Sequence, residues 1–125
     1  MKYLGIDFGL RRIGLSTSEG NLASPFKTIE AVGFKDAVEK IVEIINHEKI
    51  DKVIVGLPEG KMGKTVLRFV NSLKKMGLNI QTSDETLSSK KALGQMIESD
   101  VPQKKRRFND TVAACIILQD YLDSL

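Results

Sequence analysis

The sequence predicts an α/β fold in which a mixed five-stranded sheet, in the element order βββαβαβα, is flanked by helices. Three observations support this prediction. Residues 2–8, 12–18 and about 22–29 resemble three strands that follow one another closely enough to form a meander. Residues 34–48 carry apolar side chains at helical spacing. Residues 51–57 contain an unbroken apolar run that ends at a proline, which is typical of a strand covered on both faces.

The second half of the chain continues this alternation of helices and strands. A second amphipathic helix ends at Gly77 and is marked by apolar residues at helical spacing: Val66, Phe69, Val70 and Leu73. A short fifth strand is expected at 78–82, and a helix at about 86–98. A polar and basic loop at 99–107 then leads into a last helix at about 109–124, so the final helical part is split in two.

Length and composition predict one domain that spans residues 1–125, with 42% hydrophobic and 28% charged residues. The net charge of +3 permits a nucleic acid partner without requiring one. The single cysteine, Cys115, excludes an internal disulfide, and the only histidine, His47, has no evident partner for catalysis. Because no apolar stretch approaches the roughly 20 residues of a membrane span and no signal peptide is evident, we expect a cytoplasmic protein without membrane association.

Asp7 is the most informative residue, because it places a carboxylate in a strand that is otherwise apolar. Strand alternation assigns two opposite sets of side chains to the two faces of the sheet: Leu4, Ile6 and Phe8 to one, and Tyr3, Gly5 and Asp7 to the other. An unpaired carboxylate is costly to desolvate. Asp7 could cap a hairpin turn, or it could bind a metal if other acids converge on it.

Two acids from distant segments could join Asp7. Asp84 is a natural helix cap after the fifth strand, which leaves Glu85 free to reach the end of the sheet. Asp110 could also be a cap, but Asn109 serves equally well. Asp110 also begins a stripe at helical spacing that should face the sheet: Ala113, Ala114, Ile117 and Tyr121. The two alanines would allow close approach of helix and sheet.

If Asp7, Glu85 and Asp110 converge, their hard oxygen ligands would select Mg²⁺ or Mn²⁺. Two such ions about 4 Å apart can stabilise the attacking and leaving oxygens of phosphodiester hydrolysis. Basic residues beside the acids would then hold a nucleic acid backbone: Arg11, Arg12, Lys104, Lys105, Arg106 and Arg107. The run of four cations could instead be a solvated loop.

Four segments together resemble the YqgF/RuvX family of RNase H-like proteins, which are described as pre-16S rRNA nucleases and Holliday junction resolvase-like proteins. The matching segments, in order, are Asp7-Phe8-Gly9-Leu10-Arg11-Arg12-Ile13-Gly14, Gly56-Leu57-Pro58, residues 84–89 and residues 109–122. The resemblance covers nearly the whole chain. It implies an RNase H-like fold, metal-dependent nuclease activity, and Asp7, Glu85 and Asp110 as the acids.

The implied substrate is pre-16S rRNA, processed at its 5′ end during ribosome biogenesis, or branched DNA in recombination and repair. Two residues depart from the family pattern. Thr86 stands where an arginine is usual, and Arg107 stands one turn before Asp110, where related resolvases carry a fourth metal ligand. Thr86 would alter a contact to the substrate, whereas Arg107 cannot bind a metal, so we expect a second ion to bind weakly without substrate. We expect a monomer or a weak homodimer. A junction resolvase would need a symmetric dimer, because it cuts two strands.

Three alternatives remain open. Gly63-Lys64-Thr65 resembles part of a phosphate-binding loop, but that motif requires a glycine where this chain has Pro58. Met62 and the glycines around it are expected instead to form a flexible loop at the edge of the site. An actin-like ATPase also opens with an Asp-x-Gly strand, yet it needs two such domains to enclose a nucleotide. An RNase H-like module that binds nucleic acid without catalysis is the strongest alternative.

Overall fold

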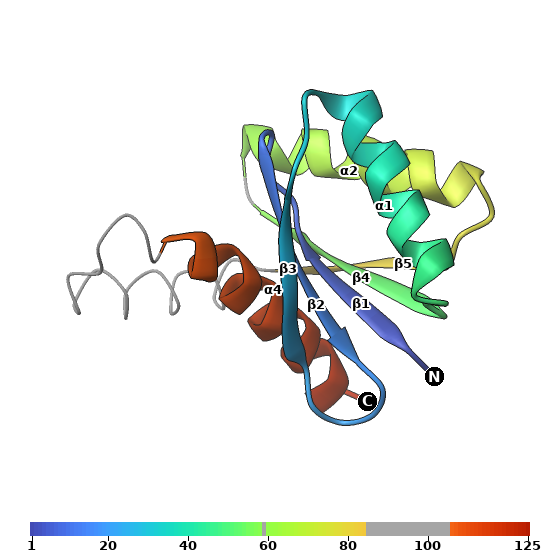
Figure 1. Cartoon of the computed structure of the whole chain (residues 1–125), viewed down its shortest axis with the longest axis vertical. Coiled ribbons are helices and arrows are strands. Elements are labelled where there is room, and N and C mark those ends of the chain that lie inside the picture. The colour runs from blue at the N-terminus through green and yellow to red at the C-terminus, as the bar shows by residue number, and fades with distance from the viewer. Residues whose placement is uncertain (59, 85–105) are drawn as a thin grey trace.

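The structure is a computed structural model, and it describes residues 1–58, 60–84 and 106–125. The described strands form one sheet in the order β3-β2-β1-β4-β5 (Figure 1). Their bounds are β1 Tyr3–Asp7, β2 Arg12–Ser18, β3 Ser24–Glu30, β4 Lys52–Leu57 and β5 Ile80–Asp84. Strands β1, β2 and β3 pair antiparallel, whereas β4 pairs in parallel with both β1 and β5. The predicted mixed five-stranded sheet is therefore confirmed.

Helices cover both faces of the sheet (Figure 1). Helices α1 (Phe34–His47) and α2 (Lys61–Lys75) pack on one face, and α4 (Arg106–Asp123) packs on the other. The larger core lies under α1 and α2 and includes the fully buried Leu4, Ile6, Ile41 and Phe69. The smaller core, under α4, is formed by Ile54, Ile117, Leu118 and Tyr121. The face assignment predicted for the first strand is thus correct.

Helix α4 lies unusually close to β1 and β2 because those strands present small residues to it. The Ser16 hydroxyl donates a 2.8 Å hydrogen bond to the backbone carbonyl of Ala114. A Cβ atom added to Gly5 would lie only 2.8 Å from the Leu118 Cβ and 2.9 Å from the Ala114 carbonyl oxygen, closer than ordinary contact allows. The close approach predicted from the alanines of the last helix is confirmed, and Gly5 and Ser16 of the sheet contribute to it as well.

The predicted bounds of α2, β5 and α4 differ from the structure. Helix α2 begins at Lys61, so the prediction of a flexible loop around Met62 is wrong. Gly60, at φ 81°, turns the chain sharply enough for the helix to start there. Strand β5 ends at Asp84 rather than at 82, because its parallel register with β4 pairs Asp84 with Leu57. Helix α4 begins at Arg106 rather than at 109, so the basic loop ends earlier than predicted.

These boundaries also bear on two sequence-based alternatives. Only three positions separate Leu57 from Lys61, and Gly63-Lys64-Thr65 lies inside α2, so the long loop that cradles phosphates in a P-loop does not fit. The helix predicted at 86–98 lies outside the described residues. Within the described part of the chain, no helix combines the length and the apolar character needed to cross a membrane.

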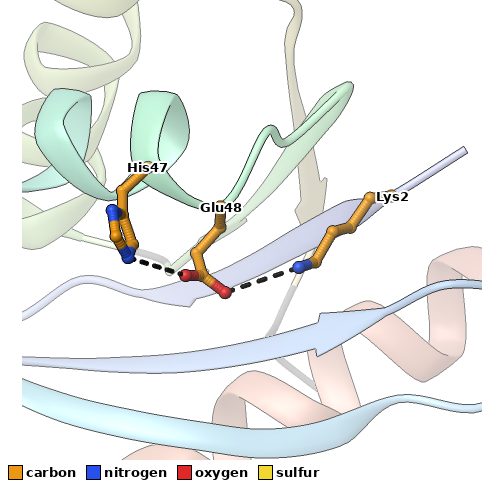
Figure 2. A network of polar contacts seen from close by, with 3 residues as sticks. All are labelled: Lys2, His47 and Glu48. Carbon is orange, nitrogen blue, oxygen red and sulfur yellow. Dashed lines mark hydrogen bonds and ion pairs between the residues drawn. The ribbon is translucent and has the colours of Figure 1, made fainter.

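The lone histidine lies at the opposite end of the molecule from the ends of β1 and β4. Figure 2 shows Glu48 between two basic side chains, with Lys2 Nζ at 3.4 Å and His47 Nε2 at 3.7 Å from its carboxylate oxygens. The backbone N–H of Lys2 also donates a 2.7 Å hydrogen bond to Asp51. These contacts join the start of β1 to the end of α1, which indicates a structural role for this region.

Candidate functional site

Asp7 ends β1 on the face of the sheet that α4 covers. Two residues on the same face of β1 show this directly: the ring of Tyr3 lies 6.0 Å from that of Tyr121, and Gly5 packs against Leu118. Alternation along the strand gives Asp7 the same orientation. Its side chain is half-buried and has interactions within the protein. The carboxylate is therefore held at the C-terminal edge of the parallel strands, beside the N-terminal part of α4.

Asp110 approaches the same point from the last helix. Gly14 is the residue of β2 that pairs with Asp7 across the antiparallel ladder. A Cβ atom added to Gly14 would overlap the backbone carbonyl of Asp110 and would lie 2.8 Å from the Asp110 Cβ. Asp110 thus packs directly over the strand position opposite Asp7. The structure brings together these two acids, which are separated by more than 100 residues in the sequence.

One oxygen of the Asp110 carboxylate accepts no hydrogen bond from the described residues. Its Oδ2 atom is buried and receives no hydrogen bond from any described residue, and the side chain as a whole is 24% exposed. Among the described side chains, Arg12 forms an ion pair with it, with Nε 3.6 Å from Oδ2 and so beyond hydrogen-bond distance. Burial raises the pKa of the Asp110 carboxyl, and the Arg12 guanidinium opposes this shift in part. A buried acceptor in this state suits a cation as its missing partner.

Arg12 also connects Asp110 to a cavity at the tip of the β1–β2 hairpin. The cavity has a volume of about 730 Å³ and is lined by the hairpin tip and the segment after β3: Leu10, Arg11, Arg12, Glu30, Ala31, Val32 and Gly33. The two segments are joined by a 3.0 Å hydrogen bond from the Ala31 N–H to the Arg11 carbonyl. Both arginine side chains are exposed, so the cavity offers positive charge beside Asp110.

The segment at residues 30–33 was missed by the sequence-based reasoning. Gly33, at φ 133°, is its one local signal, because that backbone conformation favours glycine where the chain turns from β3 into α1. A turn signal alone does not reveal that the segment folds against the hairpin tip, since that contact joins positions about 20 residues apart.

Several predicted site residues cannot be placed. Glu85, Thr86, Lys104 and Lys105 lie outside the described residues, and no group of three or more metal-ligating side chains occurs among those that are described. Arg106 and Arg107 form the first turn of α4 instead of a loop, but their side chains also lie outside the description. Of the predicted phosphate contacts, only Arg11 and Arg12 have described side chains, and both flank the site.

Comparison with solved structures identifies proteins that share the fold of this chain. Thermus thermophilus RuvC, solved in complex with a Holliday junction substrate, superposes with a TM-score of 0.63 at 14% identity, covering 99% of this chain and 96% of RuvC. The fowlpox virus resolvase, also solved with Holliday junction DNA, gives a TM-score of 0.67 at 12% identity over 99% and 98% of the two chains. At these identities the likeness concerns the fold, and it confirms the predicted RNase H-like architecture.

Comparison of this sequence with those of known proteins identifies its family. A protein of Endomicrobium trichonymphae named "Putative pre-16S rRNA nuclease" is 36% identical over 133 residues, which cover 98% of this chain and 95% of that protein. A protein of Clostridium tetani with the same name is 38% identical over 135 residues, covering 100% and 98%. The family model described as "RuvX: Holliday junction resolvase" matches residues 1–124. The chain therefore belongs to the RuvX family.

Proposed function

We propose that this protein is a metal-dependent endonuclease that hydrolyses phosphodiester bonds in structured nucleic acid, and that its role is 5′-end processing of pre-16S rRNA in the cytoplasm. The observation that carries the chemistry is the buried, unsatisfied Oδ2 of Asp110 beside the end of β1, where Asp7 lies. The names of the relatives supply the substrate.

Asp7, Glu85 and Asp110 are the proposed ligands for Mg²⁺ or Mn²⁺. Asp7 and Asp110 fit this assignment, because both are hard oxygen donors at one strand-end edge and one of them has an unmet acceptor. Glu85 follows Asp84, at the C-terminal end of the strand that neighbours β4. A bound divalent ion would activate water and stabilise the leaving oxygen.

The chain itself would position the substrate. Arg11 and Arg12 line the cavity at the hairpin tip and could hold the phosphates that flank the scissile bond. Arg12 would also offset the charge of Asp110 when no substrate is bound, since its Nε lies 3.6 Å from Oδ2. The cations at 104–107 precede Asp110 in sequence and are proposed as further phosphate contacts.

Holliday junction cleavage is the second candidate function. The family description and the two resolvases solved with junction DNA favour it. Cutting two strands symmetrically requires two active sites related by a two-fold axis, so this candidate predicts a dimer, whereas rRNA processing is compatible with a monomer or weak homodimer. Absence of cleavage would instead favour a non-catalytic RNase H-like module that binds nucleic acid.

A cleavage assay on two substrates tests these candidates together. Purified protein is incubated with an RNA that carries the precursor 5′ extension of 16S rRNA, and separately with a four-way DNA junction, each with Mg²⁺, with Mn²⁺ or with EDTA. We expect metal-dependent cleavage of the RNA, and its loss in Asp7→Asn and Asp110→Asn. Cleavage of the junction alone would favour the resolvase, and cleavage of neither substrate would refute the nuclease proposal.

A further inference from the structure

Helix α2 carries a concentration of positive charge that the proposed catalytic site does not use. Between Lys61 and Lys75 it contains four lysines and one arginine and no acidic residue. This charge of +5 exceeds the net charge of +3 of the whole chain, so the remaining residues are net negative. Helix α2 therefore concentrates positive charge without any acid in the same segment, and a local concentration of this kind is the electrostatic footprint of a polyanion partner.

Four of the five cations on α2 lie along one side of the helix, and Lys74 lies off this line. Residues at successive spacings of three, four, three and four positions fall on the same side of a helix. Five exposed residues follow this spacing, four of them cationic: Lys61, Lys64, Arg68, Asn71 and Lys75. We call this set the α2 stripe. The opposite side of the helix is buried in the core through Val66, Phe69, Val70 and Leu73. The stripe spans 14 residue steps, or about 21 Å along the helix axis.

The charges of the α2 stripe are not used within the described part of the chain. No ion pair there includes Lys61, Lys64, Arg68 or Lys75. Arg68 is instead held over the Phe34 ring, with its guanidinium carbon 5.1 Å from the ring centroid. This contact orients the cation without neutralising it, so its charge stays available to a partner. Lysines without ion pairs on a rigid helix are suited to bind phosphates.

The α2 stripe begins at the edge of the sheet where Asp7 lies. Helix α2 starts soon after the end of β4, which pairs in parallel with β1, so the start of α2 and the end of β1 share one edge. Figure 1 shows the start of α2 and the β1–β2 hairpin tip on the same side of the molecule, from which α2 runs away along the sheet. The candidate site lies on the α4 face and α2 on the opposite face, so a polyanion that passes round this shared edge could continue along the helix.

We propose that the α2 stripe binds the phosphate backbone of a duplex arm of the substrate that extends away from the cleavage site. This inference rests on the proposed function for its substrate class. About 21 Å of helix corresponds to roughly six base pairs of duplex at about 3.4 Å for each pair. The contacts would be independent of base sequence, because lysine and arginine on an exposed helix face meet phosphates rather than base edges.

The test compares two double variants that remove the same charge. Lys64→Gln with Lys75→Gln alters the α2 stripe, whereas Lys35→Gln with Lys49→Gln removes two exposed lysines elsewhere on the surface. Binding to a stem-loop RNA with a long duplex arm is titrated in EDTA at several salt concentrations, so that no cleavage takes place. The stripe variant should reduce the slope of log affinity against log salt by up to about 1.8, or about 0.9 for each phosphate that is no longer neutralised. The control should retain the wild-type slope.

Each outcome decides the proposal. An unchanged slope in the stripe variant would overturn it and would favour an acidic protein as the partner of α2. An equal reduction in both double variants would overturn it too, because the effect would then reflect net charge alone. Wild-type cleavage of the precursor RNA is measured separately. If the wild type cleaves and the stripe variant keeps the wild-type slope, only the proposed role of the α2 stripe is refuted. If the wild type does not cleave and the stripe variant has a reduced slope, the proposed nuclease activity is refuted and the α2 stripe is retained as a binding surface.

Discussion

Gly14→Ala should damage the candidate site by separating Asp110 from Asp7. A Cβ atom at position 14 would overlap the Asp110 carbonyl group, and backbone atoms cannot rotate away as the end of a flexible side chain can. Helix α4 would have to retreat by about 1 Å at this point, at a cost of about 1–3 kcal/mol in the free energy of unfolding. The backbone of Gly14 does not have a positive φ, so the expected effect of the substitution is steric and not conformational.

The loss of activity should exceed what this loss of stability explains. A displacement of about 1 Å in catalytic geometry can lower a rate by about 100-fold, even where the protein stays folded. We would measure the melting temperature, expected to fall by about 4–12 °C for a chain of this size, and the cleavage rate well below it. Gly20→Ala is the matched control, because a Cβ atom there meets nothing within 4 Å. Wild-type cleavage by folded Gly14→Ala would refute the proposed closeness of the two acids.

Further substitutions test the charges of the site. Asp7→Asn should abolish metal-dependent cleavage without lowering the melting temperature in EDTA, because it removes one of two neighbouring like charges; wild-type activity would support the binding module instead. Burial raises the pKa of Asp110 in the folded state, so its ionisation costs stability that returns as pH falls toward the unfolded value of 3.8. In EDTA, the free energy of unfolding of the wild type, measured by urea titration, should therefore rise relative to that of Asp110→Asn as the pH is lowered from about 7 to about 4. A difference in free energy that does not change with pH would contradict this. Arg12→Gln should tighten Mn²⁺ binding measured by calorimetry and weaken RNA binding, because Arg12 faces Asp110 and lines the cavity; two changes of the same sign would argue against this. Alanine at all four positions 104–107 should lower the salt slope of RNA binding by up to about 0.9 for each phosphate contact, and an unchanged slope would indicate a solvated segment.

Patterns along single elements made much of this structure predictable. Alternation in the first strand assigned Leu4 and Ile6 to one face and Asp7 to the other, because period two is intrinsic to a strand. Helical spacing predicted that Asp110 begins the side of α4 that meets the sheet, and buried Ala114 and Ile117 confirm that side. These predictions needed no knowledge of which elements become neighbours.

Predictions that depend on pairing between elements were less accurate. The bounds of β5 were displaced because its length follows the register with β4 and not its own composition. The first turn of α2 was missed because Gly63 and Thr65 are weak helix formers. Packing compensates there, since a Cβ atom at Gly63 would lie 2.6 Å from the Pro58 carbonyl oxygen and would prevent the close approach of the two segments.

The candidate site itself follows from a residue that carries no functional group. An acid on α4 reaches the end of β1 only where the helix backbone can touch the sheet, and Gly14 is where this contact occurs. The nearby Ser16 fixes the same approach through its hydrogen bond to Ala114. A larger side chain at either position would leave both acids in the sequence and separate them in space. The pairing of Gly14 with Asp7 across the ladder therefore determines the geometry of the site as directly as the acids determine its chemistry.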